Sequence, residues 1–339
     1  MGDKATRIGV LGGGSWGTAL AQLLAAQGHR VTLWALEPEV VAGINEEHKN
    51  PLYMSDLTLA RSIWATGDQR EAVVDAEMVL SVIPAQFVRE NLVALRDHLP
   101  PGIPLVICSK GIERQTLANM HQVFEDELPS KSRSGVCVLS GPSFAAEVAR
   151  NMPTNVTVAA TDHAVAEKVQ GIISTRNFRV YTTDDVVGVE IGGALKNVIA
   201  IAVGASDGLG LGNNARAGLI TRGLAELTRL AVSLGGRPET MLGLAGVGDL
   251  ILTCTSDLSR NRTVGRMLAQ GKTPDEIQRE MRQVAEGVPT SASAYNLANK
   301  QNVDLPIIEQ VYRVLHGGET VHDAMKALQD RALKAEWSV

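Results

Sequence analysis

The sequence predicts an α/β protein in which a doubly wound parallel sheet is followed by a mostly α-helical C-terminal domain. Three observations predict this fold class. The first half alternates short apolar runs with longer amphipathic ones, which is typical of strands and helices in a sheet covered on both faces. A glycine-rich turn separates the first apolar run from the first amphipathic one. From about residue 186 onward, apolar-periodic segments follow one another with little strand-like pattern between them.

Six short apolar runs predict buried strands, at 7–11, 30–34, 78–83, 105–108, 136–139 and 155–160. Helix-like spacing between them predicts helices at 15–27, 38–48, 86–98, 117–128 and 164–173. The same spacing in the second half predicts helices at 186–205, 213–234, 274–282, 291–300, 307–315 and 320–333, with breaks at 206–212 and 235–238. A chain of 339 residues suffices for two domains, which we place at 1–188 and 189–339.

The composition excludes several classes of function. There are 32 Lys and Arg residues against 37 Asp and Glu, a net charge of −5, so no strong positive field attracts nucleic acid or an anionic membrane. The three cysteines lack a C-x-x-C motif, which excludes a dense disulfide framework and fits a reducing cytoplasm. No apolar run reaches the roughly 18 residues of a membrane helix, so we expect no membrane insertion. The histidines are scattered, and we therefore expect no metal site.

The glycine-rich turn at residues 12–17 fits the pattern G-x-G-x-x-G. Gly12 permits the tight turn, Gly14 lets a pyrophosphate approach the backbone, and Gly17 lets helix and strand pack closely. The N–H groups of the following helix then face the phosphates. The motif is also compatible with a merely tight strand–helix turn. The order of strand, motif and helix favours a nucleotide site.

Glu37 is the candidate for distinguishing NAD from NADP. An acid after the second strand hydrogen-bonds the ribose 2′-OH, whereas a base accommodates a 2′-phosphate. Glu37 is the only acid at this point and no Arg is adjacent. Alternatively, Glu37 simply opens the next helix beside Pro38, where a negative charge suits the helix dipole. The sequence leaves both interpretations open.

Two polar motifs follow predicted strands, and the carboxyl ends of such strands line the ligand crevice. Lys110 follows the strand at 105–108, where a cation would suit an anionic substrate, although a lysine at a strand end is usually solvated. Gly141 and Pro142 form a firm turn after the strand at 136–139. Ser143 lies beside that turn and could also be a helix N-cap, although Glu147 falls one position too late for the usual capping box.

Lys196 is the most informative residue of the second half. It lies in a long apolar segment, where a solvated lysine would be unusual. Burial lowers the pKa of a lysine toward the range useful for proton transfer at neutral pH. Gly192 and Gly193, one turn earlier, would allow a ligand or helix to approach closely. The alternative is a lysine that snorkels at the edge of a helix face.

Further candidates follow along the chain. Asp249 could orient a lysine or accept a hydrogen bond from a substrate hydroxyl; its other interpretation is a turn residue beside Gly248. Arg260 offers a planar fork for a phosphate or carboxylate, with Ser259 and Asn261 as neutral hydrogen-bonding groups. The alternative for the arginines is a solvated helix face.

Taken together, these motifs resemble the NAD(P)-dependent glycerol-3-phosphate dehydrogenase family in its bacterial form. The resemblance runs from about Ile8 to about Ala332 and rests on six motifs in order, at 12–21, 109–113, 141–145, 193–200, 213–217 and 259–262. It implies a Rossmann-type N-terminal domain and a helical substrate-binding domain, in a cytoplasmic homodimer. It also implies interconversion of dihydroxyacetone phosphate and sn-glycerol 3-phosphate with NAD or NADP. This reaction would supply glycerol 3-phosphate for phospholipid synthesis.

The resemblance assigns a role to each matching residue. Lys196 is the proton donor and acceptor, assisted by Lys110 and Asp249. The substrate contacts it implies are Lys110, Gly141, Ser143, Lys196, Asn197, Asp249, Ser259, Arg260 and Asn261. To the glycines and Glu37, which the motif and the end of the second strand already indicate, the resemblance adds as cofactor contacts Ser15, Trp16, Lys110, Ala145, Arg260, Val284 and Glu286. One departure is Leu36, because bacterial relatives often carry Arg or His there to hold the 2′-phosphate of NADP.

Two other functions remain compatible with the sequence. One is a different dehydrogenase with a similar two-domain plan, acting on a 3-hydroxy acid or a sugar acid. The other is a non-catalytic redox sensor that binds the nucleotide and signals through its helical domain. Lys196 argues against the sensor, since a sensor needs no titrating lysine.

Overall fold

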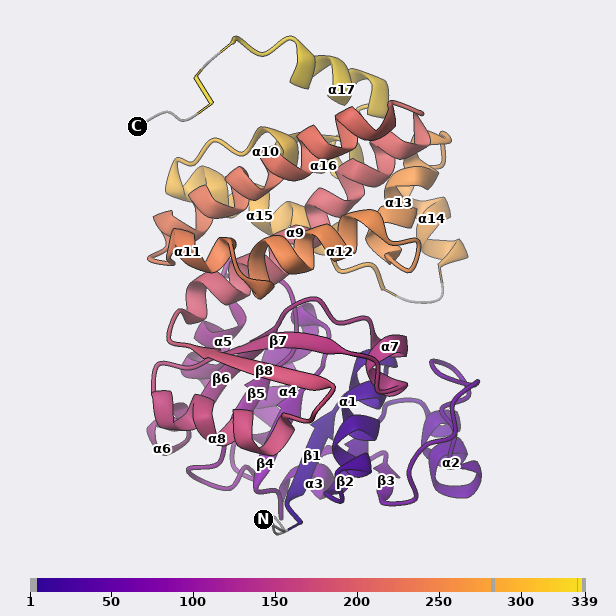
Figure 1. Cartoon of the computed structure of the whole chain (residues 1–339), viewed down its shortest axis with the longest axis vertical. Coiled ribbons are helices and arrows are strands. Elements are labelled where there is room, and N and C mark those ends of the chain that lie inside the picture. The colour runs from indigo at the N-terminus through magenta and orange to yellow at the C-terminus, as the bar shows by residue number, and fades with distance from the viewer. Residues whose placement is uncertain (1–4, 282–283, 334, 337–339) are drawn as a thin grey trace.

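The structure is a computed structural model and describes residues 5–281, 284–333 and 335–336. A sheet with its helices forms the lower half of Figure 1, and a group of helices forms the upper half. Arg282, where one predicted helix ends, lies outside the described residues. The strands are β1 (Arg7–Leu11), β2 (Arg30–Trp34), β3 (Ile63–Thr66), β4 (Met78–Ser81), β5 (Leu105–Ile107), β6 (Val136–Ser140), β7 (Thr154–Ala159) and β8 (Phe178–Thr183).

These strands form one sheet in the order β3-β2-β1-β4-β5-β6-β7-β8. The prediction of an entirely parallel sheet is wrong at one pair, because β7 runs antiparallel to β6. The chain turns through the short helix α7 (Ala145–Ala149) after β6 and starts β7 from the same end of the sheet. Two strands that the sequence did not predict, β3 and β8, lie at the two edges. Edge strands are half exposed, as Trp64 in β3 and Tyr181 in β8 show, so they lack a continuous apolar run.

Helices cover both faces of the sheet, as predicted for a doubly wound fold. Alternate strand residues enter two separate cores: Val106 packs in one, and its neighbours Leu105 and Ile107 pack in the other. The helices of this half are α1 (Ser15–Ala26), α2 (Pro38–Glu47), α3 (Gln69–Val73), η1 (Ala85–Phe87), α4 (Val88–Leu95), α5 (Met120–Glu127), α6 (Ser130–Arg133), α7 and α8 (His163–Ile173). The strands β1–β6 run in one direction and present their carboxyl ends at one edge of the sheet, which faces the upper half of the molecule, whereas β7 and β8 run in the opposite direction.

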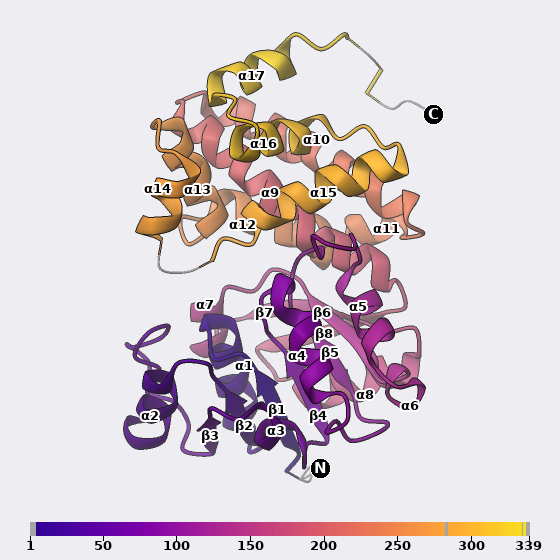
Figure 2. The same ribbon diagram turned by 180° about the vertical axis from the view of Figure 1, so that it is seen from behind.

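The upper half is built around α9 (Val186–Gly208), which starts beside the sheet and continues through the centre of the helical region (Figure 2). The helices around it are α10 (Gly212–Ser233), α11 (Pro238–Met241), η2 (Leu244–Gly248), α12 (Asp249–Thr255), α13 (Arg260–Ala269), α14 (Pro274–Glu280), α15 (Gly287–Gln301), α16 (Pro306–His316) and α17 (Val321–Gln329). In the described residues, α9 is long and apolar enough to span a membrane, but 89% of its apolar window is buried inside the protein. Its hydropathy is therefore that of a core helix.

Two differences from the predicted helices affect the site. The predicted break at 206–212 begins too early, because α9 continues to Gly208. The helices α12 and α13 were not predicted at all, and each begins at a candidate site residue, Asp249 and Arg260 respectively.

Candidate active site between the sheet and the central helix

The glycine-rich turn after β1 has the backbone geometry that a dinucleotide needs. Gly12 has φ +124°, which other residues rarely adopt, and a Cβ on Gly17 would lie 1.8 Å from the Gly12 carbonyl oxygen. Gly14 is the N-cap of α1, and among the described residues no side chain caps this helix end and no atom lies within 4 Å of the Gly14 Cβ position. The first N–H groups of α1 are therefore free to meet a pyrophosphate, and the turn fits NAD or NADP.

Ser15 and Trp16 are the first two residues of α1. The Ser15 hydroxyl donates to the carbonyl of Tyr53 at 3.4 Å. The indole N–H of Trp16 is buried and has no hydrogen-bond partner among the described residues. A buried donor without a partner is costly, so this one also fits a ligand-binding region.

A carboxylate between the two halves of the molecule holds two lysines. Lys196 is buried in α9, and its amine donates to Oδ1 of Asp249 and to the hydroxyl of Thr253, the latter at 3.0 Å. Lys110, just beyond β5, donates to Oδ2 of the same Asp249 at 2.7 Å. Asp249 is the first residue of α12 and is only 1% exposed. The structure thus brings together three predicted residues that lie far apart in the chain, and the turn interpretation of Asp249 is wrong.

The charges of this cluster set its proton chemistry. Burial is the main reason that the pKa of Lys196 falls to about 7; the positive charge of Lys110 acts in the same direction, and Asp249 opposes both. Burial also disfavours ionised Asp249, but Lys110 and Lys196 outweigh it and lower the pKa of this carboxyl. Asp249 therefore stays ionised while Lys196 can gain or lose a proton near neutral pH.

Two glycines let α9 approach the strand ends at this point. A Cβ on Gly193 would lie 2.7 Å from the hydroxyl oxygen of Ser140 at the end of β6, and 3.7 Å from Cγ of Lys110. A Cβ on Gly192 would lie 2.5 Å from the carbonyl oxygen of Ala245. The predicted close approach one turn before Lys196 is therefore made by the protein itself, and it places the Lys196 amine beside Lys110.

The turn after β6 borders the same cluster. Gly141 has φ +137°, and its carbonyl oxygen accepts from the Lys110 amine at 3.4 Å and from the Ser143 hydroxyl at 3.0 Å. Ser143 is not the helix N-cap that the sequence allowed, because Phe144 occupies that position and Ala145 begins α7.

The helical half contributes a second group of predicted residues. Ser259 is buried and caps α13 by accepting from the backbone N–H of Arg262 at 3.2 Å. The first helical residue, Arg260, is exposed, and its guanidinium donates to the carbonyl of Val284 at 2.9 Å. Asn261 donates to the amide oxygen of Asn197, the residue that follows Lys196 on α9, at 2.9 Å. Asn197, Ser259, Arg260 and Asn261 therefore gather at the contact of α9 with α13.

The segment after α14 returns to the strand ends. Glu286 accepts a hydrogen bond from the backbone N–H of Ala85, just beyond β4, and its carboxylate lies 3.8 Å from a Cβ position on Gly111. Burial raises the pKa of Glu286 to about 7, and the charge of Arg260 acts in the opposite direction. Val284 is 54% exposed. Both residues are thus near Arg260, on the side of the cluster that faces β4.

Glu37 is held in a defined position at the end of β2. It is the N-cap of α2, as its second interpretation requires, but its side chain makes no cap. Its Oε1 accepts from the Tyr53 hydroxyl at 2.7 Å. In the described residues, the Glu37 carboxylate therefore hydrogen-bonds Tyr53 and not the backbone N–H groups at the start of α2.

Sequence reasoning missed two residues of this region, Thr253 and Tyr53. Thr253 lies four residues after Asp249, so both share one face of α12; that spacing would have indicated it had a helix been predicted there. Tyr53 lies in an irregular segment between α2 and β3, and no pattern in the sequence connects it with Glu37.

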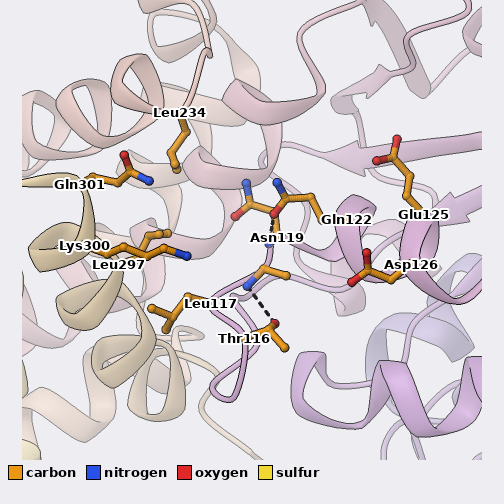
Figure 3. Close-up of a pocket in the computed structure, with 11 residues that line it drawn as sticks. Thr116, Leu117, Asn119, Gln122, Glu125, Asp126, Leu234, Leu297, Lys300 and Gln301 are labelled. Carbon is orange, nitrogen blue, oxygen red and sulfur yellow. Dashed lines mark hydrogen bonds between the residues drawn. The ribbon is translucent and has the colours of Figure 1, made fainter.

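The structure also has a pocket away from this site. A pocket of about 460 Å³ opens between the start of α5 and the ends of α10 and α15 (Figure 3). Polar side chains line it from both α5 and α15, and none of the predicted site residues lines it. The described residues contain no group of three or more His, Cys, Asp or Glu side chains suited to a metal ion.

Comparisons with known proteins agree over nearly the whole chain. Residues 7–166 match the N-terminal part, and residues 185–326 the C-terminal part, of the NAD-dependent glycerol-3-phosphate dehydrogenase family. The chain belongs to this family. Glycerol-3-phosphate dehydrogenase [NAD(P)+] of Citrifermentans bemidjiense is 53% identical over 332 residues, which cover 98% of this chain and 99% of the relative. The enzyme of the same name from Geobacter sulfurreducens is 54% identical and covers 97% of this chain and 98% of its own.

A solved structure of glycerol-3-phosphate dehydrogenase from Coxiella burnetii has the same fold. It superposes with a TM-score of 0.91 at 37% identity and covers 96% of this chain and 99% of its own. The predicted resemblance to the glycerol-3-phosphate dehydrogenase family, and the predicted fold class, are therefore confirmed.

Proposed function

We propose that this chain is an NAD(P)-dependent oxidoreductase that interconverts dihydroxyacetone phosphate and sn-glycerol 3-phosphate. The observation that carries the proposal is the buried cluster of Lys196, Asp249 and Lys110. It lies at the carboxyl ends of the same sheet whose first strand leads into the dinucleotide turn. The relatives that match over the whole chain bear the name of this activity.

The nicotinamide, when bound, supplies or accepts the hydride at substrate C2. In the reduction, Lys196 holds a proton at Nζ and donates it to the substrate oxygen as the carbonyl becomes an alcohol. In the oxidation, neutral Lys196 removes that proton. A pKa of about 7 lets one amine serve both directions near neutral pH.

The neighbours of Lys196 prepare it for this exchange. Asp249 fixes the position of the amine through a charged hydrogen bond, and Thr253 accepts a second one. Lys110 lowers the pKa of Lys196 and places a positive charge where the substrate carbonyl oxygen gains negative charge. Gly141 and Ser143 supply polar groups at the border of this cluster.

The phosphate of the substrate needs a cation and neutral donors, and the start of α13 supplies both. Arg260 is exposed there, and within residues 5–281 and 284–333 the one hydrogen bond of its guanidinium goes to the Val284 carbonyl. Beside Arg260 lie the side chains of Asn261 and Asn197 and the N-terminal end of α13, which Ser259 caps. We assign the phosphate to this group. We assign the dinucleotide to residues 12–17 with Glu37, Ala145, Val284 and Glu286.

The division into a dinucleotide-binding domain at 1–188 and a substrate-binding domain at 189–339 belongs to the same proposal. So do a homodimeric assembly, a cytoplasmic location without membrane insertion or bound nucleic acid, and a role in supplying glycerol 3-phosphate for phospholipids. The family membership and the buried position of α9 support them.

A steady-state assay of dihydroxyacetone phosphate reduction with NADH and with NADPH tests the function. Carboxylated ketones of similar size are the matched comparison, because they would be the substrates of a hydroxy-acid dehydrogenase with the same domain plan. Turnover of the phosphorylated ketone supports the proposal. Preference for a carboxylated ketone, or cofactor binding without turnover of any ketone, would contradict it; the second result is what a redox sensor would give.

A further inference from the structure

The choice between NADH and NADPH depends on the end of β2, where the structure shows a feature that the sequence did not. β2 ends at Trp34, Leu36 is 78% exposed, and Glu37 follows directly. The residues on both sides of Glu37 are uncharged. A 2′-phosphate at this point would meet a carboxylate and no adjacent cation, whereas a ribose 2′-OH would meet an acceptor.

Tyr53 holds the Glu37 carboxylate in one orientation. Its hydroxyl donates to Oε1 at 2.7 Å, and in the described part of the chain no side chain or backbone group occupies Oε2. The hydrogen bond to Glu37 is the main reason that the pKa of Tyr53 rises to about 12, with burial as a second cause. The phenol therefore stays a donor, and the second carboxylate oxygen is left for a hydroxyl.

A buried asparagine fixes the segment that carries Tyr53. Asn50 is fully buried, and its amide donates to the carbonyl of Gly13 and to the hydroxyl of Thr18, both at 2.8 Å. Its amide oxygen accepts from the backbone N–H of Tyr53 at 3.1 Å. The Tyr53 carbonyl in turn accepts from Ser15. The dinucleotide turn and the Glu37–Tyr53 pair are thus connected through one hydrogen-bonded network.

We propose that Glu37, oriented by Tyr53, makes this enzyme select NADH over NADPH by accepting a hydrogen bond from the ribose 2′-OH. The proposal rests on the proposed function, since it concerns the cofactor of that reaction. Glu37 is the selecting residue and Tyr53 is a positioning residue. The names of the matching relatives contain both cofactors, as NAD(P)+.

Isothermal titration of the full-length protein with NADH and with NADPH, without substrate, tests the proposal independently of turnover. We expect NADH to bind at least tenfold more tightly, about 1.4 kcal/mol. Glu37→Gln should reduce this ratio to less than about threefold, because it removes the repelling charge. Tyr53→Phe should weaken NADH binding by roughly threefold and leave NADPH binding unchanged, since it removes one hydroxyl only.

A combined Leu36→Arg and Glu37→Ser variant should reverse the preference toward NADPH. Glu39→Gln, an exposed acid in the first turn of the same helix, is the matched control and should keep the wild-type ratio. Thermal unfolding of each variant detects a folding defect. If Tyr53 had only a structural role, Tyr53→Phe would lower the unfolding temperature without changing the ratio of NADH to NADPH affinity.

The outcomes separate this proposal from the function itself. Equal affinities in the wild type, or an unchanged ratio in Glu37→Gln, would overturn the selectivity while dihydroxyacetone phosphate is still reduced. Tight NADH binding without reduction of dihydroxyacetone phosphate would contradict the function and leave the selectivity intact. Binding of neither cofactor would overturn both.

Discussion

Asp249 and Glu226 are equally buried, each about 1% exposed, yet their surroundings shift their pKa values in opposite directions. Asp249 lies between the sheet and the helical region, where two lysine amines contact it. Glu226 lies in the core of the helical region on α10. It accepts hydrogen bonds from the backbone N–H groups of Ile307 and Ile308, at 2.8 and 3.1 Å.

Burial acts on both carboxyls in the same direction, by disfavouring the charged form. At Glu226 it prevails over the two backbone hydrogen bonds and raises the pKa to about 7. At Asp249, Lys110 and Lys196 outweigh burial and lower the pKa. Lys110 follows β5 in the sheet half and Lys196 lies on α9 in the helical half. Asp249 therefore contacts both cations because it lies between these two parts of the fold. The surroundings of a buried carboxyl therefore decide whether it stays ionised beside cations, as Asp249 does, or gains a proton near neutral pH, as Glu226 does.

Replacing Lys196 tests this contrast most strongly. Lys196→Ala should lower kcat by about 10²–10⁴, the usual contribution of a proton-transfer group. Steady-state kinetics measure the loss, and circular dichroism verifies folding. Lys300→Ala is the matched control, because Lys300 is an exposed lysine on α15, away from the cluster. Near-normal turnover of folded Lys196→Ala would remove this residue from the mechanism.

Glu226 should affect stability rather than catalysis. Because its folded pKa of about 7 lies above the unfolded value of 4.5, its stabilising effect is complete below pH 4.5 and is lost as the pH rises through 7. Between pH 5 and 8 the wild type should therefore lose about 2 kcal/mol of unfolding free energy relative to Glu226→Gln, which cannot titrate. Urea unfolding at both pH values measures this difference. A difference that does not change with pH, or a large loss of kcat in Glu226→Gln, would contradict the assignment.

The pH dependence of the reaction should report the charge on Lys196. Reduction needs the protonated amine, so its kcat/KM should fall about tenfold per pH unit above about pH 7. Oxidation needs the neutral amine, so its kcat/KM should rise about tenfold per pH unit as the pH approaches about 7 and level off above that value. In Lys110→Met the midpoint should move to higher pH, because a positive charge that lowers the pKa of Lys196 is removed. Profiles that are flat through pH 7, or a midpoint that moves to lower pH, would show that another group titrates.

Arg260 gives the smallest expected effect. Arg260→Lys keeps the positive charge but loses the planar fork, so KM for dihydroxyacetone phosphate should rise about fivefold with little change in kcat. Arg266→Lys on the same helix is the matched control, since Arg266 pairs with Asp257. An unchanged KM in Arg260→Lys and in Arg260→Ala would exclude Arg260 from the phosphate site.

Much of the fold could be predicted because its signals are local. The first two strands are predicted at the bounds that the structure shows, since each is a short run of mostly apolar residues. The dinucleotide turn follows from three glycines at fixed spacing, two of which the backbone geometry requires. The edge strands β3 and β8 escaped prediction because only one of their faces is buried, and the antiparallel pairing of β7 depends on how the chain returns after α7.

Local patterns along the chain were enough to single out three candidates for the chemistry: a lysine in an apolar helix, a lysine after a strand and an acid beside a glycine. The fold was needed to show that Lys196, Lys110 and Asp249 share one buried site with Thr253, and that Tyr53 hydrogen-bonds Glu37. The physical reason is that a pKa and an ion pair depend on distances through space and on access to water. Neither quantity can be obtained from spacing along the chain.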